Sequence, residues 1–132
     1  MKKIDHIGIA VKDMNVSNIL FEKLLGVSHY KTEEVLSEGV LTSFFRSENN
    51  KIELLAATHP DSVIAKFIEN KGEGIHHIAF EVENIEEEIQ RLKKEGFTVL
   101  NEQPKVGADN KLVVFLHPKS TNGVLIELCQ KI

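Results

Sequence analysis

The sequence contains little of several residue types that mark particular classes of protein. Trp is absent from the 132 residues, Tyr30 is the one tyrosine, and Cys129 is the one cysteine. A single cysteine excludes an internal disulfide and a cysteine-clustered zinc module, and it fits a reducing compartment. With so little Trp and Tyr, the chain also has no aromatic platform on which bases could stack.

An excess of basic charge and a long apolar run are missing as well. Sixteen Lys and Arg against twenty Asp and Glu leave a formal net charge of −4, whereas non-specific nucleic-acid binding requires a basic footprint. No segment approaches the roughly 20 apolar residues that span a bilayer. We therefore expect a cytoplasmic protein with no nucleic-acid or membrane partner, folded as a single domain over residues 1–132.

What the chain does contain is a repeated order of signals. A strand pattern that begins with His-Ile starts at His6 and again at His77. A helical pattern follows each strand, at 14–25 and 85–95, and ends at a glycine, the residue most favoured just past a helix. An Ile-Glu-Leu strand then closes each half. The two halves therefore look like copies of one module.

Further extended segments lie between the helix and the last strand of each half. They are 27–36 and 40–45 in the first half, and 98–100 and 112–116 in the second. Each half then reads strand–helix–strand–strand–strand, and a short helix at 62–70 connects them. The pattern predicts an α+β fold of two tandem βαβββ modules, about 1–57 and 75–132, with a connection at about 58–74.

Four ionisable side chains share one predicted face of these strands. Because strand side chains alternate, His6 and His77 point away from the apolar face that packs on the helices, and so do Glu53 and Glu127 of the Ile-Glu-Leu strands. Two imidazoles and two carboxylates suit one divalent ion such as zinc, cobalt, nickel or manganese. The alternative, structural histidines and solvated glutamates, remains open at this point.

The motifs resemble a known family. The His-Ile-Gly-Ile-Ala-Val opening and the central His-His-Ile-Ala-Phe-Glu-Val are similar to the vicinal oxygen chelate superfamily, which includes glyoxalase I, extradiol dioxygenases and antibiotic-resistance proteins. Within it, Phe-Leu-His-Pro-Lys-Ser at 115–120 and Gly-Val-Leu-Ile-Glu-Leu at 123–128 resemble the methylmalonyl-CoA epimerases. The resemblance covers essentially the whole chain.

The resemblance implies a curved mixed sheet around a metal-binding cleft. The family's ligand positions fall on His6, Glu53, His77 and Glu127, around one divalent ion of the cobalt, nickel, zinc or manganese kind. It implies an acyl-CoA substrate, a homodimer, and interconversion of (R)- and (S)-methylmalonyl-CoA by removal of the proton alpha to the thioester carbonyl.

The resemblance also implies roles for individual residues. Proton exchange on opposite faces requires two acid/base groups, for which Glu127 and Glu53 are candidates. Some epimerases carry a glutamate where this chain has Thr42, so a water held by Thr42 is an alternative to Glu53. We expect Lys119 and Ser120, on the turn before the last strand, near the thioester or its carrier.

Two rival functions share this pattern. A glyoxalase I-type lactoylglutathione lyase would use the same four ligand types, with glutathione in place of coenzyme A as the carrier. A non-catalytic antibiotic-binding resistance protein would have no need of the four polar side chains, all of which are present here.

Overall fold

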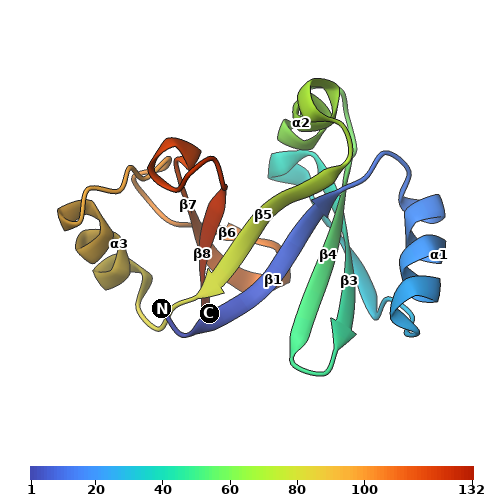
Figure 1. The fold of residues 1–132 in the computed structure, drawn as a ribbon, viewed down its shortest axis with the longest axis horizontal. Coiled ribbons are helices and arrows are strands. Elements are labelled where there is room, and N and C mark those ends of the chain that lie inside the picture. The colour runs from blue at the N-terminus through green and yellow to red at the C-terminus, as the bar shows by residue number, and fades with distance from the viewer. The chain divides into compact units, whose positions relative to one another are not determined.

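A computed structural model describes all of residues 1–132 and contains two compact units. One unit comprises His6–His76, and the other comprises His77–Ile132 together with Met1–Asp5. Three single-turn 3₁₀ helices, η1 to η3, accompany the larger elements. The elements are β1 (Lys3–Ala10), α1 (Met14–Leu25), β2 (Lys31–Val35), η1 (Leu36–Glu38), β3 (Val40–Ser47), β4 (Asn50–Ala57), α2 (Val63–Lys71), β5 (Gly74–Glu81), α3 (Ile85–Lys94), β6 (Lys105–Gly107), η2 (Ala108–Asn110), β7 (Lys111–Leu116), η3 (Pro118–Ser120) and β8 (Ile126–Lys131) (Figure 1). The α+β class and the two βαβββ modules are confirmed.

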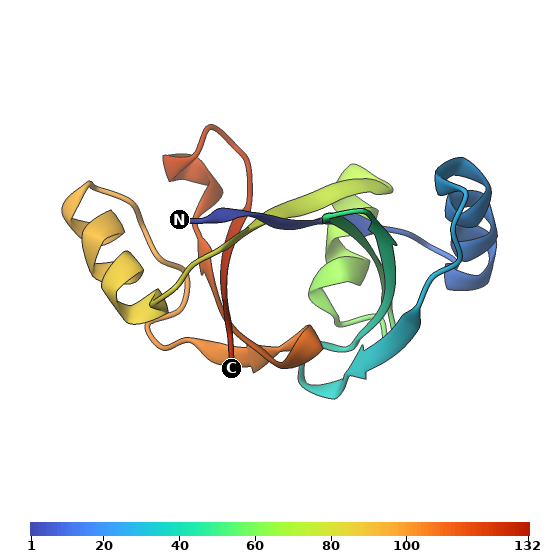
Figure 2. The ribbon, with the colours of Figure 1, turned by 90° about the horizontal axis from the view of Figure 1, so that it is seen from below.

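In the His6–His76 unit the strand order is β2-β3-β4-β1, with β1 parallel to β4 and the other pairs antiparallel. α1 and α2 pack on opposite faces of this sheet (Figures 1 and 2). The side chains under α1 are Ile9, Val11, Phe45, Leu54 and Ala56. Those under α2 are Ala10, Val40 and Leu55. The face opposite α1 is therefore only partly polar, because α2 covers one end of it.

In the other unit the strand order is β5-β8-β7-β6, again with one parallel pair, β5 and β8. α3 buries Ile85, Ile89 and Leu92 against Val114 and Leu128 of this sheet. The buried positions of β5 are His77, Ala79 and Glu81, which alternate as the sequence predicts. In each module the first and last strands therefore pair in parallel, and the other neighbouring strands pair antiparallel.

Side-chain caps define where the helices begin. The N–H groups of Val16, Ala65 and Glu87 donate to side-chain oxygens of Asp13, Ser62 and Asn84, respectively. The longest helix, α1, has 12 residues, so no helix is long enough to cross a bilayer.

One predicted strand is wrong. Residues 98–100 form no strand: Val99 makes a single isolated bridge with Leu116, and the second strand of this module is Lys105–Gly107. Within this segment, the backbone of Thr98 and Leu100 hydrogen-bonds to the end of β7. The side-chain amide of the next residue, Asn101, donates to the Gln103 carbonyl. The predicted segment 27–36 is likewise shortened to Lys31–Val35.

Candidate metal centre

The His6–His76 unit contains a buried histidine–carboxylate pair. His6 on β1 and Glu53 on β4 are both about 95% buried, at 5% and 4% exposure, and His6 Nδ1 lies 3.2 Å from Glu53 Oε2. The parallel register places Gly8 opposite Glu53, so His6, two residues earlier, projects from the same face as the glutamate. The local strand geometry thus brings together two side chains that are 47 residues apart in sequence, from 6 to 53.

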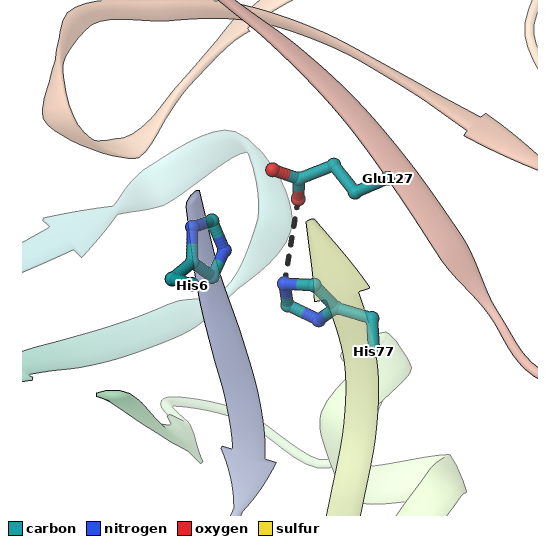
Figure 3. A group of neighbouring side chains, drawn as sticks. All are labelled: His6, His77 and Glu127. Atoms are coloured by element: carbon teal, nitrogen blue, oxygen red, sulfur yellow. Dashed lines mark ion pairs between the residues drawn. The ribbon is translucent and has the colours of Figure 1, made fainter. Parts of the chain in front are cut away.

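The other unit contains an equivalent pair. His77 Nε2 on β5 lies 3.5 Å from Glu127 Oε1 on β8, and both side chains are buried (Figure 3). The register repeats as well, because Ala79 lies opposite Glu127. The ring of Phe115 packs edge-on against His77, with ring centroids 5.9 Å apart. This contact fixes the plane of the imidazole beside the carboxylate.

Each pair has the chemistry of half a metal site. A carboxylate buried without a partner costs several kcal/mol, and in each unit a histidine lies within ion-pair distance of it. Nitrogen and carboxylate-oxygen ligands suit zinc and its first-row neighbours. The residues present therefore fit a divalent ion. The pairing of each glutamate with the histidine of its own module is a feature that the sequence pattern alone did not predict.

The neighbouring His76 has a different environment. Its ring packs edge-on against Phe67 of α2, with centroids 4.9 Å apart and planes at 80°. Burial, and secondarily the charge of Lys71, lower its pKa from 6.5 to about 4. His76 is therefore neutral near pH 7 and is held by an aromatic contact.

Thr42 lies on the same face as Glu53. It is 1% exposed on β3 and stands opposite Leu55, while Phe44 stands opposite Glu53 in the same register. In the other module, Phe115 stands opposite Glu127 and Val113 occupies the place of Thr42. The hydroxyl of Thr42 is thus a polar group that the second module lacks at the equivalent position.

The turn that carries Lys119 and Ser120 is held by its own hydrogen bonds. Ser120 Oγ donates to the His117 carbonyl at 2.9 Å and accepts from the Thr98 N–H at 3.3 Å. The Lys119 N–H donates to His117 Nδ1 at 3.0 Å, while the Lys119 side chain is exposed. Gly123 closes the turn at φ +85°, a conformation that favours glycine. Ser120 therefore has a structural role in this turn, and Lys119 offers a cation to solvent.

A buried ion pair was missed by the sequence reasoning. Lys111 Nζ lies 2.7 Å from Asp5 Oδ2, and these side chains are 6% and 2% exposed; Asp109 Oδ2 lies 3.6 Å from the same nitrogen. Strand alternation offers a signal, because Lys111 shares the parity of Phe115, which faces the metal-centre side of β7. The identity of its partner, 106 residues away, carries no local signal.

Comparison with known proteins identifies the class. A family model described as the Glyoxalase/Bleomycin resistance protein/Dioxygenase superfamily matches residues 5–115. The chain belongs to this superfamily.

Among its relatives, the ethylmalonyl-CoA/methylmalonyl-CoA epimerase of Cereibacter sphaeroides is 42% identical over 97% of both chains. The mitochondrial methylmalonyl-CoA epimerase of Homo sapiens is 40% identical over 97% of this chain and 73% of its own length. A solved structure of a variant of Streptomyces coelicolor methylmalonyl-CoA epimerase, in complex with 2-nitronate-propionyl-CoA, has a TM-score of 0.91 at 31% identity, covering 99% of this chain and 98% of that one. The resemblance to the methylmalonyl-CoA epimerases is confirmed.

Proposed function

We propose that this protein is a metal-dependent epimerase that interconverts (R)- and (S)-methylmalonyl-CoA. The observation that carries the proposal is the duplicated pair of buried histidine and glutamate, present at the same register in both modules. Near-full-length similarity to epimerases of acyl-CoA substrates supports the choice of reaction. The class of enzyme is an isomerase.

The four paired side chains are the proposed ligands of one divalent ion. His6, Glu53, His77 and Glu127 would hold cobalt, nickel, zinc or manganese, all of which accept nitrogen and carboxylate ligands. When bound, such an ion supplies positive charge that favours removal of a proton alpha to a carbonyl. Burial of the four ligands strengthens this effect, because charges interact more strongly where water is excluded.

The carboxylates supply the acid/base groups. Epimerisation removes the alpha proton from one face of the substrate and returns a proton to the other, so two groups must flank that carbon. Glu127 accepts or donates the proton on one side. Glu53 is the second group in this proposal, and a water held by the Thr42 hydroxyl is its alternative, since both lie on one face of the same sheet.

The remaining assignments concern the carrier and the assembly. The exposed ammonium of Lys119 is suited to an anionic group of the acyl-CoA substrate, and Ser120 holds the turn that presents it. We further propose a cytoplasmic homodimer. The similarity to epimerases of acyl-CoA substrates supports the assignment of the carrier.

The decisive experiment follows alpha-proton exchange by NMR. The purified protein is stripped with a chelator, reloaded with cobalt, and given methylmalonyl-CoA in deuterated water, with methylglyoxal plus glutathione as the parallel substrate. We expect metal-dependent exchange with the coenzyme A ester alone. Turnover of the glutathione adduct alone would instead identify a lactoylglutathione lyase, and silence with both substrates would contradict the proposed reaction.

A matched pair of variants tests the histidine assignment. His77→Ala should lose bound cobalt and exchange, because it removes a ligand. His76→Phe should keep both, because phenylalanine preserves an aromatic contact with Phe67 and removes only ring nitrogens. Cobalt content measured by elemental analysis checks this prediction, and equal loss in the two variants would refute the choice of His77.

A further inference from the structure

The chain passes from one compact unit to the other at two peptide bonds. These are the bond between Asp5 and His6 and the bond between His76 and His77. Each proposed metal-binding histidine is therefore the first residue after a crossing, and the residue before it belongs to the other unit. The preceding residue limits where the backbone of each histidine can lie, because successive Cα atoms are about 3.8 Å apart.

Asp5 is held by a buried ion pair. Lys111 Nζ donates to Asp5 Oδ2 at 2.7 Å, both groups are more than nine-tenths buried, and Lys111 also lies 3.6 Å from Asp109. A charge-assisted bond of this kind is shorter and stronger than a bond between neutral groups. Since successive Cα atoms are about 3.8 Å apart, fixing the Asp5 side chain also restricts where the backbone of His6 can lie.

At the second crossing, His76, the residue before His77, is held by an aromatic contact. Its ring packs edge-on against Phe67 of α2, within the His6–His76 unit. Edge-to-face aromatic pairs are worth about 0.5–1.5 kcal/mol beyond their burial. The backbone of His77 starts from this anchored residue.

We propose that Lys111, through Asp5, is a positioning residue for His6, and that the contact between Phe67 and His76 positions His77 in the same manner. The inference rests on the proposed function, since it requires both histidines to bind the metal. Ligands must be held to about 0.5 Å for a productive site, and removal of an orienting partner typically lowers metal affinity about 10–100-fold. Lys111 itself binds no metal in this scheme.

Cobalt binding to the purified full-length protein tests the first anchor. Lys111→Met should weaken cobalt affinity about tenfold or more and alter the visible absorption of the bound ion, since its coordination geometry relaxes. Lys131→Met is the matched control: Lys131 lies opposite Lys111 in the strand register, but its side chain is 70% exposed and pairs with Glu81 instead. It should keep wild-type affinity and spectrum.

A second variant tests whether misfolding explains a weakened cobalt affinity in Lys111→Met. Lys111→Met leaves Asp5 buried without its cation, so the double variant Asp5→Asn with Lys111→Met removes both charges together. It should fold, as judged by cooperative thermal unfolding of the metal-free protein, and still show the weakened cobalt affinity. At the second crossing, His76→Ala and Phe67→Ala should each weaken cobalt binding, whereas His76→Phe should not.

The outcomes separate this inference from the proposed function. Wild-type affinity and spectrum in both Lys111 variants would overturn the positioning role while leaving the metal site intact. Equal weakening in Lys111→Met and Lys131→Met would also overturn it, because the effect would then be one of general stability. Absence of cobalt binding by the wild-type protein would remove the proposed function, and this inference with it.

Discussion

Helices α1 and α3 hold equivalent places in the two modules but bury different kinds of side chain. α3 buries Ile85, Ile89 and Leu92 at regular helical spacing. α1 buries Met14 together with the polar residues Ser17 and Asn18, and the Ser43 hydroxyl donates to the Asn18 side chain at 2.6 Å. Four apolar side chains of α1 are instead more than half exposed: Val16, Ile19, Leu20 and Leu24.

The sheet faces that carry the buried glutamates differ far less between the two modules. In both modules a small residue and a phenylalanine flank the buried glutamate: Gly8 and Phe44 beside Glu53, and Ala79 and Phe115 beside Glu127. The repeated features of the chain are therefore concentrated where we place the metal. The helical faces, which need only cover a core, differ between the modules.

The largest expected effect is the loss of alpha-proton exchange when either glutamate is replaced. Glu127→Gln should lower alpha-proton exchange about 10²–10⁴-fold, because an amide can neither accept nor return the proton. Glu53→Gln should retain bound cobalt through its amide oxygen while also losing exchange, if Glu53 is the second acid/base group. Exchange rates normalised to cobalt content check both. Undiminished exchange in Glu53→Gln would show that Glu53 is not the second acid/base group.

The next largest effect is a difference in the free energy of unfolding between variants of α3 and α1. Ile89→Ala removes a fully buried side chain of α3 and should cost about 2–5 kcal/mol in the free energy of unfolding. Leu20→Ala on α1 removes an exposed side chain and should change stability by less than about 0.5 kcal/mol. Urea unfolding at low protein concentration measures both. A comparable loss in Leu20→Ala would mean that this face of α1 is covered in solution.

The pKa of His76 should make the stability of the protein depend on pH. Its pKa is about 4 when folded and about 6.5 when unfolded, so the unfolded chain binds the proton more tightly between these values. Stability should therefore fall as the pH drops from about 6.5 toward 4, by at most about 3 kcal/mol from this residue.

The measurement compares metal-free wild-type protein with His76→Phe by urea unfolding across that pH range. His6 and His77 are present in both proteins, so the difference between the two curves isolates His76. Parallel curves would contradict the lowered pKa.

The smallest expected effect concerns Thr42. Thr42→Val makes the first module match the second, which has Val113 at the equivalent position. With Glu53 as the second acid/base group, exchange should change by less than about tenfold, which corresponds to about 1.4 kcal/mol in the barrier. A larger loss at unchanged cobalt content would favour a water held by the Thr42 hydroxyl.

Periodicity predicted most of this fold. The helix at 14–25 and the parity that groups His6 with Glu53 follow from spacing alone, because alternation and helical repeats are local properties. The strand Lys105–Gly107 escaped prediction because three residues after a proline carry too short a pattern. The pairing of Lys111 with Asp5 escaped because the tertiary fold, not local sequence, chooses that partner.

Met1–Asp5 belong to the same compact unit as His77–Ile132, so strand β1 is divided between the two units. Cleavage of the chain at one position cannot separate the two compact units. A fragment beginning at residue 75 would keep Lys111 but lose its partner Asp5. Loss of the closer of its two carboxylate partners would leave the buried Lys111 ammonium with Asp109, 3.6 Å away, and is destabilising. A gene encoding one module alone would therefore have to supply a substitute for Asp5 before its product could fold as it does here.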